Sequence, residues 1–164
     1  MDYLKDEIDN LITNPEEGKC IGIIKLLMVK EYQNLYGEGS MDSPEAAADY
    51  VRPIFEHADR EMVVVMSLNS RLEPMAVEIV SIGGTDFCQI DIKNIFKHSL
   101  LNNSGDIICF HNHPSGNTTP TSEDLMLTRR IQSAGNILGI RLRDHIVIGG
   151  KEHYSILHNK RNRR

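Results

Sequence analysis

DIICFHNHPSGNTTPTSED, residues 106–124, is the stretch of the sequence that decides the class of the fold. Residues 106–113 form an apolar run that ends in polar residues, which is typical of a central strand whose C-terminal end reaches a functional site. Pro114 ends this strand, and Thr121 is the expected N-cap of a following helix. A buried strand that leads through a polar loop into a helix predicts an α/β protein.

Elements on both sides of this stretch complete the predicted sheet. A helix is expected from Ser43 to about residue 58, because serine caps helices and Pro44 suits the first helical position. Two runs rich in β-branched residues, 61–69 and 74–82, are joined by a polar turn and predict a hairpin. The other expected elements are a helix opened by Asp91, a helix from about 122 to 134 that stops at Gly135, and a strand at 140–150. This order predicts a mixed central β-sheet flanked by helices.

The chain is expected to hold one main domain with a short piece at each end. Its 164 residues suit about one domain. Residues 1–42 contain two stretches with apolar residues at helical spacing and end in a polar linker, which predicts an N-terminal helical appendage. This appendage either covers the main domain or forms a homodimer or partner contact. The main domain is expected to span residues 43–158, followed by a basic C-terminal tail at 159–164.

The composition excludes several classes of protein. A formal net charge of −5 argues against a protein whose main task is to bind the phosphate backbone of nucleic acid. The three cysteines include no CxxC pair, so the sequence predicts neither a disulfide framework nor a thiolate zinc knuckle. The most apolar run, residues 20–29, is too short to cross a bilayer and contains Lys25. The chain is therefore expected to be cytoplasmic, without a membrane span or a secretion signal.

Three side chains within residues 106–124 have the chemistry of zinc ligands. Alternate residues of a strand point to one face, so His111 and His113 are expected to lie side by side. If Thr121 caps the next helix, Asp124 lies in its first turn, where its carboxylate can lean toward the histidines. Two imidazoles and a carboxylate suit a catalytic zinc site with an open fourth position. Two other interpretations stay open: Thr121 and Asp124 form a capping box that only stabilises the helix, or the donor set binds non-haem iron.

These motifs resemble a known family of metal-dependent hydrolases. The spacing H-x-H-x7-T-x-x-D, with HNHPSG, LTRRI and DHIVIG in order along the chain, is similar to the JAMM (JAB/MPN) metal signature and to its RadC-like branch in particular. The resemblance covers residues 43–158 and implies a JAMM MPN fold of the cytidine-deaminase-like type, with zinc bound by His111, His113 and Asp124. It also implies a metallopeptidase activity, the hydrolysis of a peptide or isopeptide bond in a peptide or protein substrate.

The resemblance implies two catalytic side chains as well. In the JAMM pattern a glutamate at the junction of the first helix and the first core strand positions the attacking water, and Glu61 occupies such a junction. Glu73 and Glu78, on the hairpin, are the alternatives for this general base. Thr121 stands where the family pattern has serine. It keeps a hydroxyl that could hydrogen-bond to the developing oxyanion, but its methyl group restricts rotation of the side chain.

Two further features bear on function. Asp144 and His145 are similar to the DH pair of the family, and His145 either hydrogen-bonds to a zinc ligand or is satisfied by the backbone. The RadC name also carries an association with DNA repair, so an accessory role in DNA binding is the competing hypothesis. The helix-hairpin-helix module that usually precedes the domain in RadC proteins is not evident in residues 1–42, which leaves the basic tail as the candidate DNA contact.

Overall fold

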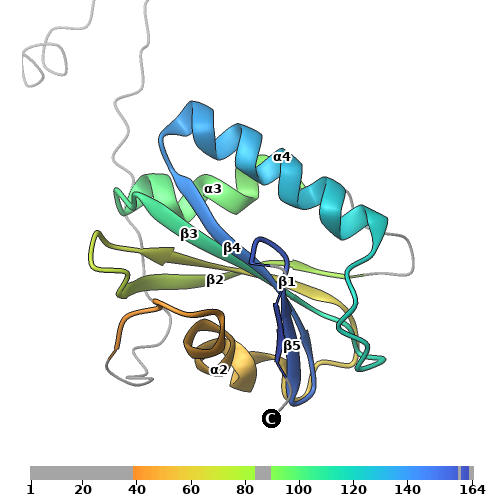
Figure 1. Cartoon of the computed structure of the whole chain (residues 1–164). Coiled ribbons are helices and arrows are strands. Elements are labelled where there is room, and N and C mark those ends of the chain that lie inside the picture. The colour runs from red at the N-terminus through yellow and green to blue at the C-terminus, as the bar shows by residue number, and fades with distance from the viewer. Residues whose placement is uncertain (1–38, 84–89, 159, 163–164) are drawn as a thin grey trace, which may run out of the picture.

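The structure is a computed structural model that describes residues 39–83, 90–158 and 160–162, with the backbone alone for the last range. The described residues form a six-stranded mixed sheet with helices on both of its faces (Figure 1). In chain order the elements are α2 (Pro44–Phe55), β1 (Met62–Leu68), β2 (Pro74–Ile82), α3 (Ile92–Leu101), β3 (Asp106–Asn112), α4 (Ser122–Leu138), β4 (Arg141–Gly149), β5 (Glu152–Ser155) and β6 (Lys160–Asn162). The predicted fold class is confirmed, whereas the two helices expected before residue 39 lie outside the described residues.

The sheet has the strand order β2-β1-β3-β4-β5-β6, and only the β3–β4 pair is parallel. β3 is buried along its whole length, as expected for a central strand. Because β1 runs antiparallel to β3, Val63 near the start of β1 lies opposite His111 near the end of β3. One edge of the sheet therefore holds the beginning of β1 and the C-terminal ends of β3 and β4. Strands β5 and β6 were not predicted, and β6 places residues 160–162 of the basic tail in the sheet.

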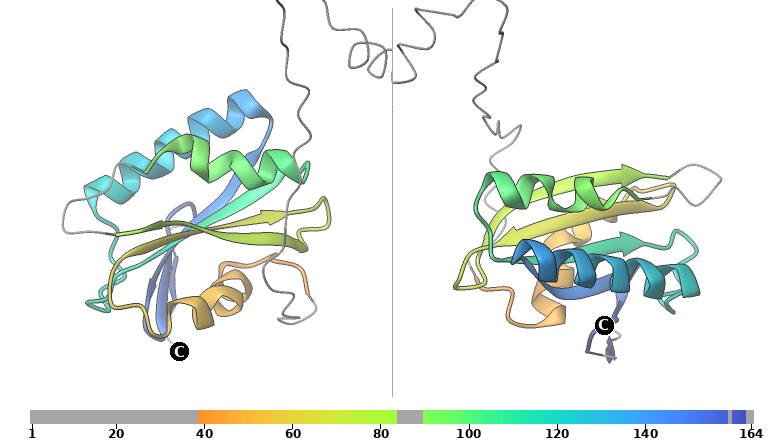
Figure 2. Two further views of the ribbon diagram at one scale, coloured as in Figure 1. Left: turned by 180° about the vertical axis from the view of Figure 1, so that it is seen from behind. Right: turned by 90° about the horizontal axis from the view of Figure 1, so that it is seen from above.

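Each face of the sheet has its own apolar core. Figure 2 shows the helices that cover these faces, with α2 on one side of the sheet and α3 and α4 on the other. Helix α2 covers one face and packs on Val64, Met66 and Leu68 of β1. Helices α3 and α4 cover the other face, where Val63 and Val65 point. This division follows from the alternation of side chains along a strand. In β3 the same alternation turns Ile107 and Cys109 toward α3 and α4. His111, two residues further on, follows this pattern.

Helix α4 is longer than the sequence predicted. It runs through Gly135 to Leu138 and ends at Gly139, which has the left-handed backbone conformation that glycine adopts without strain (φ 72°). The expected stop at Gly135 was wrong, because this glycine serves packing: a Cβ atom there would overlap the carbonyl oxygen of Ile140, just before β4. Neither α4 nor any other helix in the described part of the chain is long and apolar enough to cross a membrane.

Replacing Gly135 with alanine is expected to lower the free energy of unfolding by about 1–3 kcal/mol, because the added methyl group must push α4 away from the start of β4. This cost outweighs the gain of about 1 kcal/mol that alanine brings inside a helix. Urea denaturation measures the change. Gly105→Ala is the matched control, since a Cβ atom at Gly105 meets nothing within 4 Å. Equal unfolding midpoints for the two variants would contradict the packing role of Gly135.

Candidate metal centre

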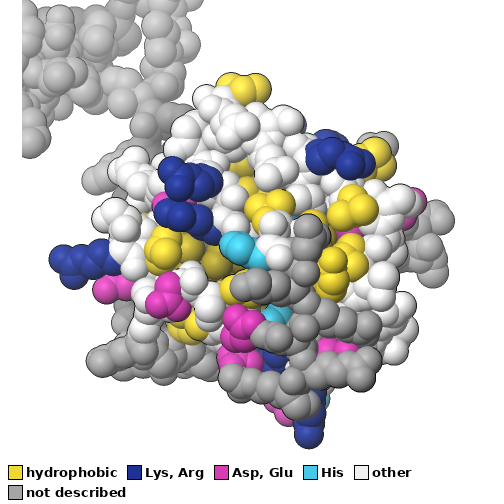
Figure 3. Space-filling model, viewed as in Figure 1, with side chains coloured by type: hydrophobic (Ala, Val, Ile, Leu, Met, Phe, Trp, Pro, Cys, Tyr) yellow, Lys and Arg dark blue, Asp and Glu magenta, His cyan; other side chains and the backbone are white. Residues whose placement is uncertain are grey.

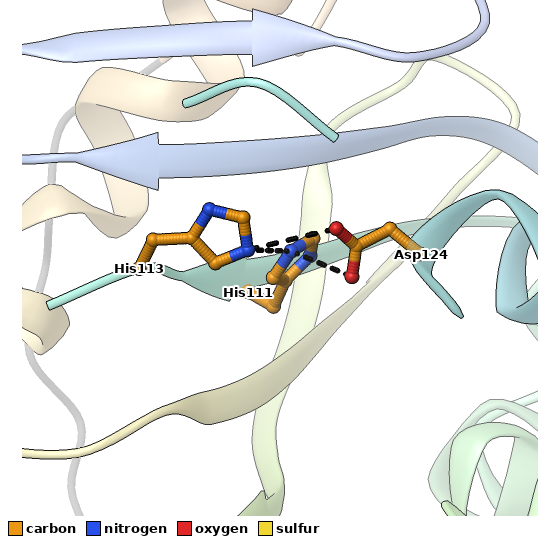
Figure 4. Close-up of side chains that lie close together, drawn as sticks. All are labelled: His111, His113 and Asp124. Carbon is orange, nitrogen blue, oxygen red and sulfur yellow. Dashed lines mark hydrogen bonds and ion pairs between the residues drawn. The ribbon is translucent and has the colours of Figure 1, made fainter. Parts of the chain in front are cut away.

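His111, His113 and Asp124 converge where β3 ends and α4 begins (Figure 4). The two Nε2 atoms of the histidines lie 3.1 Å apart. Nε2 of His111 is 3.1 Å from Oδ1 of Asp124, and Nε2 of His113 is 3.5 Å from its Oδ2. One donor atom from each residue lies within 4.8 Å of the others. The structure thus brings together the three side chains that the sequence indicates as ligands, and this cluster could hold a metal ion.

The donor set fits a divalent metal in both chemistry and spacing. Imidazole nitrogens and carboxylate oxygens bind zinc at about 2.0–2.2 Å, so two nitrogens on a tetrahedral ion lie about 3.3 Å apart. The 3.1 Å between the two Nε2 atoms is close to that value. The same set of donors also suits iron and other transition metals, so the cluster does not by itself select the ion.

The ring of His113 is oriented by a hydrogen bond on the side away from the cluster. Its Nδ1 lies 2.6 Å from the carbonyl oxygen of Asn117. A carbonyl oxygen only accepts, so Nδ1 of His113 donates and Nε2 is directed to the cluster. Loop residues 116–118, which supply this carbonyl, pack directly on Gly149 at the end of β4, where any Cβ atom would overlap the carbonyl oxygen of Gly116. The close approach of loop and strand therefore helps to place His113.

Asp124 has two roles at once. The oxygen of the Thr121 hydroxyl accepts a hydrogen bond from the backbone N–H of Asp124 (3.2 Å), and Oδ2 of Asp124 accepts one from the N–H of Thr121 (2.7 Å). This capping box was one of the two interpretations of the motif, and it coexists with the approach of Asp124 to the histidines. The oxygen of the Thr121 hydroxyl is therefore engaged within its own helical turn, by the N–H of Asp124.

Charge and burial act in opposite directions at the cluster. Burial by itself would raise the pKa of Asp124, but hydrogen bonds to His111 and His113 outweigh burial and hold this pKa well below its ordinary value. The hydrogen bond to Asp124 raises the pKa of His113 against the effect of burial, with smaller contributions from the Asn117 carbonyl and from the charges of Asp124 and Glu61. The carboxylate is thus ionised at neutral pH, and a proton competes with any metal for His113.

His145 supports the cluster from β4. Its Nε2 lies 3.0 Å from Nδ1 of His111, and its Nδ1 lies 2.6 Å from the hydroxyl of Thr128 on α4. Of the two interpretations of His145, contact with a candidate ligand is the one that the structure shows. Asp144, the other member of the DH pair, accepts hydrogen bonds from the backbone N–H groups of His145 (2.8 Å) and Leu157 (3.2 Å), so its contacts hold the strand.

Glu61 lies at the same edge of the sheet as the cluster. It directly precedes β1, and the antiparallel register puts the start of β1 beside the end of β3, where His113 follows. The residue is exposed, and the negative charge of its carboxylate contributes to the raised pKa of His113. The structure therefore places Glu61 near the candidate metal centre, although its carboxylate is not one of the three converging donors.

The backbone around Glu61 is anchored by Asn112, whose role the sequence analysis missed. Oδ1 of Asn112 accepts a hydrogen bond from the N–H of Met62 (2.7 Å), and its side-chain amide donates to the carbonyl of Arg60 (3.1 Å). Asn112 is buried at the end of an apolar strand. A polar residue in such a position needs internal partners, and this is the signal that could have drawn attention to it.

The two alternatives to Glu61 lie elsewhere. Glu78, on β2, forms an ion pair with Lys97 of α3 at 3.1 Å, and its other carboxylate oxygen lies 3.1 Å from Nδ1 of His98. Glu73 accepts a hydrogen bond from the side chain of Asn69 (2.7 Å) in the turn between β1 and β2, at the opposite end of β1 from Glu61. Neither carboxylate is among the donors that converge with the two histidines.

A cleft of about 710 Å³ opens beside His113. Its lining comes from the end of β3, from α2 and the residues after it, and from the turn between β4 and β5. Charges of both signs, from Asp49, Arg52, Glu56 and Lys151, surround apolar contacts with Phe55 and Ile148. Figure 3 likewise shows Lys and Arg side chains in separate places on one face of the described residues, with Asp and Glu among them. A second hollow, of about 530 Å³, lies on α3 and α4, and its lining includes none of the cluster residues.

Comparison with known proteins identifies relatives of this sequence. A UPF0758 protein of Carboxydothermus hydrogenoformans is 35% identical over 133 residues, which cover 80% of this chain and 59% of that protein. UPF0758 proteins of Listeria monocytogenes serotype 4b and Staphylococcus carnosus are each 37% identical, over 69% and 70% of this chain and 50% and 51% of their own length. The chain thus spans about half the length of the curated relatives it matches. The family model of the RadC-like JAB domain matches residues 41–162, and the chain belongs to this family.

Proposed function

We propose that this chain is a zinc-dependent hydrolase of the RadC/JAMM type, which cleaves a peptide or isopeptide bond. The observation that carries the proposal is the convergence of His111, His113 and Asp124 from β3, the loop after it and α4. The cleft that His113 lines supports a catalytic over a purely structural metal, because a substrate bound in it would contact one of the three candidate ligands. Membership of the RadC-like JAB family agrees with a metallohydrolase.

The proposed roles follow from where each side chain lies. Zinc held by the two histidines and Asp124 would supply Lewis acidity, which activates water near neutral pH and polarises a carbonyl group. Glu61 would accept the proton of the attacking water and pass it to the leaving amine nitrogen. Asn112 would keep the Glu61 segment in place through its two backbone contacts. Thr121 would donate its hydroxyl proton to the oxyanion, while its oxygen still accepts from the N–H of Asp124.

Metal removal and reloading test this proposal. The purified protein is stripped with a chelator, divided, and reloaded with zinc, manganese or, under anoxia, ferrous iron. Each sample is then incubated with a library of peptides that includes lysine isopeptide linkages, and the products are identified by mass spectrometry. We expect hydrolysis to disappear on stripping and to return with zinc. A zinc-loaded protein that cleaves no amide bond would contradict the proposal, and oxidised products that require iron and oxygen would assign the cluster to oxygenase chemistry.

A further inference from the structure

We infer that Thr128 and His145 are positioning residues that set the tautomer of His111 and so keep its Nε2 free to bind a metal ion. This inference rests on the proposed metal site. It concerns a support network that consists of His111, His145, Thr128 and the backbone carbonyl of Asp124. The network joins two of the three candidate ligands through side chains from β3, β4 and α4. All of its members are buried.

The direction of each hydrogen bond follows from the last acceptor in the network. The hydroxyl of Thr128 lies 2.7 Å from the carbonyl oxygen of Asp124, and only the hydroxyl can donate in this contact. The single proton of Thr128 is then used, so its oxygen must accept in the 2.6 Å contact with Nδ1 of His145. His145 therefore carries its proton on Nδ1. A fully buried imidazole is costly to charge, so its Nε2 bears no second proton.

The tautomer of His111 is the consequence. Because Nε2 of His145 accepts, Nδ1 of His111 must donate across the 3.0 Å that separate the two atoms. A neutral His111 then presents the lone pair of Nε2 to the cluster, 3.1 Å from Nε2 of His113 and 3.1 Å from Oδ1 of Asp124. His113 is fixed in the same sense by the carbonyl of Asn117. Two lone pairs and a carboxylate thus meet at a point that favours a cation, which is a metal ion or, without one, a proton that hydrogen-bonds to Asp124.

Thr128 is the residue on which this arrangement depends. Without its hydroxyl, Nδ1 of His145 loses its acceptor, and His145 can carry its proton on Nε2 instead. His145 would then donate to Nδ1 of His111, and the proton of His111 would move to Nε2, where it can hydrogen-bond to the carboxylate of Asp124. A metal ion would have to displace that proton, so its affinity would fall. In the wild-type protein the network instead keeps the proton of a neutral His111 on Nδ1.

Thr128→Val and Thr128→Ser separate the hydroxyl from the shape of the side chain. Valine keeps the volume of threonine and lacks the hydroxyl, whereas serine keeps the hydroxyl and lacks the methyl group. Zinc affinity is measured for both by competition with a chromogenic chelator. We expect Thr128→Val to bind zinc about 10–100-fold more weakly than the wild type, and Thr128→Ser to bind it within a few-fold of the wild type. Thr128→Ala, with room for a water molecule, replaces the valine variant if the latter does not fold.

A second readout reports the tautomer without any metal. Long-range ¹H–¹⁵N spectra of the metal-free protein, labelled with ¹⁵N in histidine, distinguish a proton on Nδ1 from one on Nε2. We expect His111 and His145 to carry Nδ1 protons in the wild type and in Thr128→Ser, and a shift toward Nε2 protons in Thr128→Val. Weaker zinc binding with unchanged tautomers, or changed tautomers with unchanged zinc binding, would overturn the inference. A wild-type protein that binds no zinc would refute the proposed function. The tautomers are measured without metal, so they test the network separately from the proposed function.

Discussion

Alanine in place of His113 is expected to leave the purified protein without its metal ion while the fold persists. Of the three converging donors in the described part of the chain, Asp124 and His111 would remain, and two ligands hold a divalent ion far more weakly than three. The loss of metal affinity should be larger than the drop of about 10–100-fold that follows removal of a hydrogen bond to a ligand. The fold should persist because His113 lies after β3, outside both apolar cores. Elemental analysis and chelator competition measure the metal, and thermal unfolding checks the fold.

His57→Ala is the matched control for this prediction. His57 is an exposed histidine after α2, and it is not among the converging donors. Its replacement removes one imidazole from the protein but should leave the metal content unchanged. A stoichiometric metal ion in purified His113→Ala would exclude His113 as a ligand and would move the site elsewhere.

The central part of the fold could be predicted because its signals are local. The apolar run of β3, the β-branched runs of the hairpin and the capping residues Ser43 and Asp91 each determine their own element, and the structure agrees with them. The end of α4 could not be read in this way. Gly135 is a helix stop by local propensity, but the close approach of Ile140 explains its presence inside the helix. Such a contact between two elements is absent from the sequence pattern.

The candidate site shows the same division between local and long-range information. The spacing of His111, His113 and Asp124 is visible in the sequence, because the strand, the loop and the first turn of the helix follow one another directly. The contact of Asn112 with Met62, 50 positions earlier, and the contact of Thr128 with His145, 17 positions later, are not visible in the sequence. Both are polar residues whose partners come from another element. Their importance appears only when the sheet and α4 are assembled.

The capping box at the start of α4 also explains why the motif alone was ambiguous. A threonine followed three residues later by an aspartate stabilises a helix in any protein. Here the same hydrogen bonds fix the Asp124 carboxylate beside the histidines, so one set of contacts serves both stability and the candidate site. A capping role therefore does not argue against a ligand role, and the position of β3 relative to α4 determines whether Asp124 also reaches the histidines.

Glutamine in place of Glu61 is expected to slow turnover by about 10²–10⁴-fold and to leave the metal content unchanged. Glutamine keeps the size of the side chain but cannot accept a proton at neutral pH, so the general base is lost. General acid–base catalysis typically contributes about 10²–10⁴-fold to a rate, and the amide hydrolysis proposed above should slow by a factor in this range. The backbone of the segment should not move, because Asn112 holds the carbonyl of Arg60 and the N–H of Met62. Turnover of a cleaved peptide and zinc content are measured on the same preparation.

Glu73→Gln is the matched control, and it also tests an alternative base. Glu73 is an exposed carboxylate at the far end of β1, where its partner is the side chain of Asn69. Its replacement should leave both turnover and zinc unchanged. If Glu61→Gln kept full turnover, the base would have to be sought among other groups at the edge where β1 begins and β3 ends. If Glu61→Gln lost zinc together with turnover, Glu61 would act on the metal itself, because a pure proton acceptor leaves the three-donor site intact.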